Sequence, residues 1–207
     1  MSKLQLPDVT LVAVTDVNVQ LTIQRMNKCM DEIDFGDVKL ISGIYKNDTE
    51  RFKIIEVDRI KSKRDYSYFL FYELHKYINT SHFLIVQWDG TVENPDAWKP
   101  EYLDYDYIGA IWGFREVRNE PFLMGNGGFS LRSKRLHEHL SKDPNLTQHH
   151  PEDGHICITY RTYLESLGFK FASNELAKTF AVEHQPYTGQ FGWHGGLEPM
   201  RQQIVST

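Results

Sequence analysis

This chain of 207 residues has only two cysteines, no long apolar run and no excess of basic residues. It has no run of about 18 apolar residues that could form a membrane-spanning helix. Its N-terminus, MSKLQLPD, lacks the apolar segment of a secretory signal. The formal net charge of −5 argues against a non-specific nucleic-acid binder. Cys29 and Cys157 fall in predicted helices, so we expect two buried free thiols and a reducing, cytoplasmic setting.

Apolar runs of strand length alternate with segments of helical periodicity. The predicted strands are Val9–Val14, Val38–Ile41, Phe52–Val57, Phe83–Val86, Tyr107–Trp112, Phe129–Leu131 and Phe169–Ala172. The predicted helices are Val17–Ile33, Tyr66–Ile78, Ser133–Leu140, Glu152–Leu167 and Asn174–Phe180, and Gly113–Asn119 is predicted to be a loop. This alternation predicts an α/β fold, with helices flanking a mainly parallel central sheet. The length predicts one domain over residues 1–207.

The buried strand Phe83–Val86 stops at Gln87-Trp88-Asp89-Gly90. A carboxylate and a glycine at this point suit a sharp turn at the carboxyl edge of a sheet, where open α/β folds bind ligands. The other interpretation is an ordinary turn-forming Asp-Gly pair. This stretch alone leaves both open.

A basic run and a glycine-rich loop are further candidates for ligand binding. Arg59, Lys61, Lys63 and Arg64 precede a predicted helix, and such a helix start suits a phosphate group. A solvated surface loop is the alternative. Later, Gly125–Gly128 holds three glycines in four positions, which lets the backbone approach a ligand closely. Its spacing is neither that of a Walker A loop nor that of the dinucleotide fingerprint.

Carboxylates and histidines in the second half complete the candidates. Glu152 and Asp153 open a predicted helix, where they act either as a helix cap or as a general base aimed into a cleft. The five histidines between residues 137 and 155 match no familiar zinc ligand set. His194 lies beside Trp193 in a glycine-rich loop, a setting that favours a ligand over a core residue.

Four motifs in order, LIVQWDG, GNGGFSLRS, PEDG and FGWHG, resemble the GT-A glycosyltransferases. The resemblance runs from Val9 to about Gly196 and is closest to a group of uncharacterised bacterial and viral GT-A-like proteins with a Gln-x-Asp-Gly element. It implies a single Rossmann-like GT-A domain. It also implies transfer of a sugar from a nucleoside diphosphate sugar, preferably a UDP-sugar, to a glycan hydroxyl in surface polysaccharide or glycan synthesis. An inverting reaction with Mn²⁺ or Mg²⁺ is expected.

The resemblance also implies roles for individual residues. Asp89 matches the last aspartate of the metal-binding Asp-x-Asp element and His194 a late metal ligand, whereas Gln87 replaces the first aspartate and weakens the expected metal binding. Asp153 is implied as the base and Glu152 as a hydroxyl ligand, with the assignment between them open. The resemblance implies that Thr15 contacts uridine and that Arg59 and Lys63 contact the diphosphate. Gly127 and Gly128 are implied to line the donor sugar and the acceptor. The other implied substrate-binding residues are Gln87, Trp88 and Trp193.

Two other functions compete with this interpretation. A nucleotide-sugar nucleotidyltransferase would carry a glycine-rich phosphate loop after the first strand, and VAVTDVNVQ has none. A non-catalytic carbohydrate-binding module would account for the aromatic content of 13% but leaves the Glu-Asp helix start without a purpose. Because the chain is short for a GT-A enzyme, we expect either one part of a larger enzyme or a membrane-associated partner.

Overall fold

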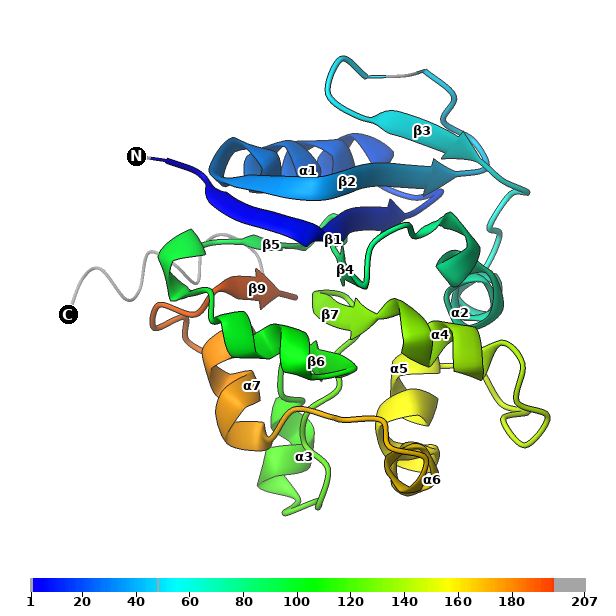
Figure 1. The fold of residues 1–207 in the computed structure, drawn as a ribbon, viewed down its shortest axis with the longest axis vertical. Coiled ribbons are helices and arrows are strands. Elements are labelled where there is room, and N and C mark those ends of the chain that lie inside the picture. The colour runs from blue at the N-terminus through cyan, green and yellow to red at the C-terminus, as the bar shows by residue number, and fades with distance from the viewer. Residues whose placement is uncertain (1, 48, 196–207) are drawn as a thin grey trace.

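A computed structural model describes residues 2–47 and 49–195 and shows a mixed α/β fold (Figure 1). Its central sheet has six strands in the order β3-β2-β1-β4-β7-β6. Their bounds are Leu4–Val14 (β1), Ile33–Ser42 (β2), Lys53–Glu56 (β3), His82–Ile85 (β4), Tyr107–Gly109 (β6) and Ser130–Ser133 (β7). Strands β3, β2, β1 and β4 pair in parallel, and β7 pairs antiparallel with both β4 and β6. The predicted mainly parallel sheet is therefore confirmed, with β7 as its one reversed strand.

Strand β1 organises the two faces of this sheet. Its last six residues are all buried, as expected for a central strand covered on both faces. Val12 and Val14 pack on one face with the segment that follows β3, whereas Leu11 and Ala13 pack on the other with helix α1 (Val19–Glu32). The carboxyl end of β1 consequently lies between two helical layers.

Most of the predicted helices are present. Helix α4 (Lys134–Leu140) begins as expected at Ser133, whose Oγ accepts a hydrogen bond from the Leu136 amide at 3.1 Å. Helix α7 spans Asn174–Phe180, with the bounds predicted from the sequence. Two other helical segments change their winding along their length. The first consists of α2 (Lys63–Tyr68), a π-helical turn (Phe69–Glu73) and a 3₁₀ turn (Leu74–Tyr77). The second consists of α5 (Glu152–Gly154), a π-helical turn (His155–Thr159) and α6 (Arg161–Ser166).

Two local predictions are wrong, and one sheet was not predicted. Gly113–Asn119 is not a loop throughout, because it contains the short helix α3 (Gly113–Val117). Phe169–Ala172 is not a strand, since only Phe171 forms an isolated bridge, to Tyr107. A second sheet, in the order β5-β9-β8, was not predicted. Its strands Gly90–Val92, Gly192–His194 and Ala181–Glu183 have three residues each, too few to show a hydrophobic period.

Both cysteines are free and buried, as predicted. Within residues 2–47 and 49–195, no helix combines the length and apolar character needed to cross a membrane. Residue 1 and residues 196–207, which include Gly196 and the ends of the predicted domain, lie outside the described residues, as does residue 48.

Candidate functional site

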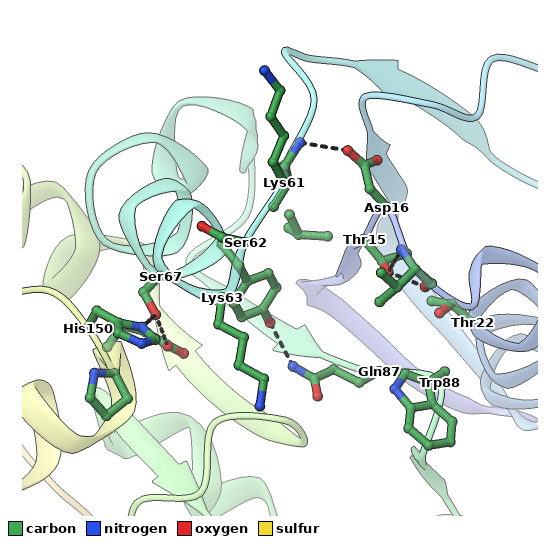
Figure 2. A pocket seen from close by; sticks show the side chains of 16 residues that line it. Thr15, Asp16, Thr22, Lys61, Ser62, Lys63, Ser67, Gln87, Trp88 and His150 are labelled. Atoms are coloured by element: carbon green, nitrogen blue, oxygen red, sulfur yellow. Dashed lines mark hydrogen bonds between the residues drawn. The ribbon is translucent and has the colours of Figure 1, made fainter.

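A cleft of about 490 Å³ lies where β1 and β4 end, at the carboxyl edge of the central sheet. Its walls include Thr15, Lys63, Gln87, Trp88, His150 and Glu152. Figure 2 shows Thr15 and Trp88 at one end, His150 and Ser67 at the other, and Lys63 and Gln87 between them. The structure thus brings together residues from four separate segments of the chain.

The end of the cleft near Thr15 is built around Asp16, which sequence reasoning missed. The Asp16 carboxylate accepts hydrogen bonds from the amides of Gly43 at 2.7 Å and Ile60 at 2.6 Å. It therefore ties the end of β2 to the segment that carries the basic residues. Thr15 Oγ1 donates to the carbonyl of Val17 at 2.5 Å, so this hydroxyl shapes the turn that leads into α1.

The basic residues are divided between two hollows. Lys61 and Lys63 line the cleft, and Figure 2 shows Lys63 extending across it towards Gln87. Neither ammonium group has an ion-pair or hydrogen-bond partner within the described part of the chain. Arg59 does not line the cleft but a neighbouring hollow of about 340 Å³, together with Tyr68 and other aromatic side chains.

Asp89 and His194 meet because β5 and β9 pair. Gly90 is opposite His194 in the register, and the Gly195 amide donates to the Asp89 carbonyl at 2.9 Å. Nε2 of His194 is 3.5 Å from Asp89 Oδ1 and 3.4 Å from Gln87 Oε1. Its Nδ1 is 3.4 Å from Glu183 Oε1. Although burial alone would lower the pKa of His194, its contacts with Asp89 and Glu183 raise that pKa to about 9.

This group of side chains fits a divalent cation. Oδ1 of Asp89 is buried and has no hydrogen-bond partner among the described residues. Nε2 of His194 faces both this oxygen and the amide oxygen of Gln87. Such donors suit Mn²⁺ or Mg²⁺. Among the residues that the structure describes, no set of three or more His, Cys, Asp or Glu side chains could hold a metal ion. Asp89, His194 and Gln87 would therefore share the ion with water and a substrate phosphate.

The glycine-rich loop passes between this group and the Glu152–Asp153 pair. A Cβ on Gly128 would lie 1.9 Å from Nε2 of His194. A Cβ on Gly127 would lie 3.0 Å from both Glu152 Oε1 and Asp153 Cβ. A Cβ on Gly127 would also lie 2.7 Å from Arg132 Nη2, so neither glycine leaves room for a side chain. The loop backbone therefore lies close to both groups of candidate side chains.

The two carboxylates have different environments. Glu152 is buried, with Oε1 3.2 Å from Nη2 of the fully buried Arg132 and Oε2 accepting from Ser67 Oγ at 3.2 Å. Asp153 is half-buried and accepts hydrogen bonds from the amides of Gly127 at 3.1 Å and Gly154 at 2.8 Å. Burial, followed by the charge of Glu152, raises the pKa of Asp153 to about 7. The raised pKa makes Asp153 a candidate for general acid–base chemistry.

Not every candidate residue reaches the cleft or its neighbourhood. Thr15, Lys63, Gln87, Trp88 and Glu152 line it. Asp89, His194, Gly127, Gly128 and Asp153 form the adjoining cluster described above. Trp193 lies in β9 between Val182 and Thr91 and does not line this cleft.

Sequence reasoning also missed several residues of the site. These are Asp16, Ser67, Asn126, Arg132 and Glu183, and His150 was considered only in a zinc site. One signal was available for Arg132, which directly follows the predicted strand Phe129–Leu131, because an arginine that is buried at such a strand end requires a partner of opposite charge. The others carry no local signal, since their partners are distant in the sequence.

Residues 50–199 match the model of a protein family described as "Protein of unknown function (DUF5672)". The chain belongs to this family. The matched part of this DUF5672 protein contains Lys63, Gln87, Asp89, the glycine loop, both carboxylates and His194, whereas Thr15 and Asp16 precede it.

A comparison with curated proteins gives no match. Similar solved structures include the mannosyltransferase PcManGT from Pyrobaculum calidifontis, in complex with GDP-Man and Mn²⁺. It has 12% identity and a TM-score of 0.48, over 82% of this chain and 56% of that one. This chain thus spans little more than half of that enzyme. Another is a glycosyltransferase involved in the glycosylation of the major capsid of PBCV-1. It has 13% identity and a TM-score of 0.49, over 95% of this chain and 98% of that one.

Proposed function

We propose that this DUF5672 protein is a glycosyltransferase that moves a sugar from a nucleoside diphosphate sugar, preferably a UDP-sugar, to a hydroxyl of a glycan. The proposal places this reaction in the synthesis of a surface polysaccharide or another glycan. One observation supports it above all: Gly127 and Gly128 separate a cation-type group, Asp89 with His194, from a carboxylate pair, Glu152 with Asp153. Transfer of the sugar needs a cation that stabilises the leaving diphosphate and a carboxylate that accepts the proton of the attacking hydroxyl.

The cleft suits a nucleoside diphosphate in size and charge. Its volume of about 490 Å³ is within the range of small-molecule sites. Lys61 and Lys63, which line it, have no ionic partner in the described residues and could pair with the diphosphate. In this arrangement the nucleoside occupies the end near Thr15 and Trp88, and the sugar occupies the end near Glu152.

The residues that would hold Mn²⁺ or Mg²⁺ are Asp89, His194 and the amide oxygen of Gln87. When bound there, the ion supplies positive charge that stabilises the diphosphate as it leaves. Glu183 would orient His194 from its other nitrogen, as outer carboxylates do at many metal-bound histidines.

Asp153 is the proposed general base. Its raised pKa allows it to take the proton of an acceptor hydroxyl near neutral pH. The hydroxyl oxygen then forms a bond to the anomeric carbon, while the bond from that carbon to the diphosphate breaks and its electron pair leaves with the diphosphate. One such displacement inverts the configuration at the anomeric carbon. Glu152, held by Arg132 and Ser67, is the proposed hydrogen-bond acceptor for a substrate hydroxyl.

Calorimetric titration with UDP-, GDP- and dTDP-sugars, each with and without Mn²⁺, tests the proposal. We expect one nucleotide class to bind in the presence of Mn²⁺ and its sugar to be released or transferred slowly. A protein that binds none of these sugars, under conditions where it is folded, would contradict the proposal. NMR of the product's anomeric proton distinguishes inversion from retention.

A further inference from the structure

Four side chains form a continuous chain of polar contacts at the sugar end of the cleft. Arg132 Nη2 donates to Glu152 Oε1 at 3.2 Å, and Ser67 Oγ lies 3.2 Å from Glu152 Oε2. The same Ser67 oxygen lies 2.9 Å from Nδ1 of His150. Figure 2 shows His150 and Ser67 together at this end, opposite Thr15 and Trp88.

The direction of these hydrogen bonds follows from the chemistry of each group. Glu152 is paired with a guanidinium that cannot accept a proton, so both of its oxygens act as acceptors. Ser67 has a single hydroxyl proton, and its residue is 2% exposed, so water has little access to complete the network. If that proton went to His150, Glu152 Oε2 would lose its Ser67 donor, at the cost of an unsatisfied buried acceptor. Ser67 therefore donates to Glu152.

This direction fixes the tautomer of His150. Because the Ser67 proton is used by Glu152, the Ser67 oxygen must accept, and Nδ1 of His150 must donate. In the neutral imidazole, the proton is then on Nδ1 and the lone pair is on Nε2. His150 lines the cleft, and its Nε2 has no hydrogen-bond partner in the described residues. A hydrogen-bond acceptor thus remains free beside Glu152.

We propose that Nε2 of His150 binds substrate by accepting a hydrogen bond from a sugar hydroxyl, with Ser67 as the positioning residue that holds the required tautomer. This inference rests on the proposed function and adds a sugar contact to it. Sugars are dense in hydroxyl donors, and an imidazole acceptor beside a carboxylate acceptor suits two hydroxyls of one ring. The donor sugar and the acceptor glycan are both possible sources of the hydroxyl.

The decisive variant is His150→Asn. The asparagine amide nitrogen can take the place of Nδ1 and donate to Ser67, but no atom takes the place of Nε2. We expect about fivefold to tenfold weaker binding of the sugar-bearing ligand, the usual effect of one lost hydrogen bond. Binding of UDP alone should be unchanged. Ser67→Ala should shift affinity in the same direction by a smaller factor, because it frees the tautomer but retains the ring.

His149→Asn is the matched control. It changes the neighbouring histidine, whose ring packs against Tyr68 and Tyr72 rather than lining the cleft. Thermal unfolding identifies any variant that fails to fold, and His150→Gln, which retains an amide near the Nε2 position, is the second variant in that case. We expect His149→Asn to bind sugar-bearing ligands as the wild type does.

Two measurements identify the source of the hydroxyl. Weaker binding of the UDP-sugar, relative to UDP and without acceptor, assigns the contact to the donor sugar. A raised KM for the acceptor at saturating donor assigns it to the acceptor glycan. A folded His150→Asn protein in which neither quantity changes overturns the inference alone. A wild-type protein that binds no nucleotide sugar overturns the proposed function and this inference with it.

Discussion

Replacing Gly128 with alanine should weaken the proposed cation site without substituting any of its proposed ligands. The new Cβ would lie 1.9 Å from Nε2 of His194 and 2.5 Å from both Cδ2 and Cε1. Non-bonded heavy atoms are about 3.5 Å apart at contact, so the imidazole would have to move by roughly 1.5 Å. That movement would separate Nε2 from Asp89 Oδ1, which is 3.5 Å away in the wild type.

The imidazole has little room for such a movement. His194 is 9% exposed, and its two nitrogens face Asp89 on one side and Glu183 on the other. Gly90 closes a further side, since a Cβ there would be 3.1 Å from Cδ2 of the ring. We therefore expect Gly128→Ala to cost about 1–3 kcal/mol of folding free energy. Because even an outer-shell change can weaken metal binding by about 10–100-fold, displacing a ligand should weaken Mn²⁺ affinity by about 100-fold or more.

Calorimetric titration with Mn²⁺ and UDP, together with thermal unfolding, measures both effects. Gly113→Ala is the control, because a Cβ at that helix start would meet only the amide nitrogen of Gln185, at 3.2 Å. It should bind Mn²⁺ and UDP as the wild type does. A Gly128→Ala protein with wild-type unfolding temperature and wild-type Mn²⁺-dependent UDP binding would refute the proposed closeness of this loop to His194.

Four further changes test separate parts of the site. Asp153→Asn should lower transfer by at least about 10²-fold while UDP binding is retained, and wild-type kcat/KM should fall as pH drops below about 7, where Asp153 takes up its proton. Because this pKa is raised on folding, the ionised group destabilises the fold above that pH, so Asp153→Asn should unfold at a higher temperature at pH 8. Asp89→Ala should weaken UDP binding only when Mn²⁺ is present. Glu183→Gln should weaken Mn²⁺ binding by about 10–100-fold by freeing the other face of His194. Lys63→Ala should weaken UDP binding by about tenfold or more at low salt and by less at high salt.

Each of these has a result that would contradict it. Equal transfer by Asp153→Asn would exclude that residue as the base, and unchanged Mn²⁺ dependence after Asp89→Ala would exclude it as a ligand. Full Mn²⁺ affinity after Glu183→Gln would show that His194 needs no support from that side. Wild-type UDP binding by Lys63→Ala at low salt would exclude Lys63 as a diphosphate contact. Its control is Lys142→Ala, which changes an exposed lysine outside the cleft and should bind UDP normally.

The sequence predicts those helices and strands that are determined by their own residues. Val9–Val14, which is apolar apart from Thr10, marks the central strand β1, and Ser133 marks the start of α4 through its own hydroxyl. The second sheet is different. Its strands are short, and residues such as Gly192, Trp193 and His194 become a strand only because Gly90–Val92 and Ala181–Glu183 lie on either side. Pairing between such distant segments has no signature in any single window of sequence.

The same contrast applies to the candidate site. Asp89, Glu152, Asp153 and His194 could be proposed individually because carboxylates and a glycine-flanked histidine suggest chemistry wherever they occur. Their different surroundings could not be predicted, since those depend on partners contributed by other elements. Nothing near Glu152 in the sequence indicates Arg132, yet this ion pair distinguishes its environment from that of Asp153.

Arg132 connects the fold to the proposed chemistry. Its guanidinium contacts Glu152, the Gly127 carbonyl and the Ser130 hydroxyl. The positive charge of Arg132 lowers the pKa of Asp153, but by less than burial and the charge of Glu152 raise it. Asp153 then experiences burial and the negative charge of its neighbour, and its pKa rises. The reversed strand β7 therefore gives the two acids different surroundings. It lies between β4 and β6 and carries Arg132, whose guanidinium lies next to the glycine loop.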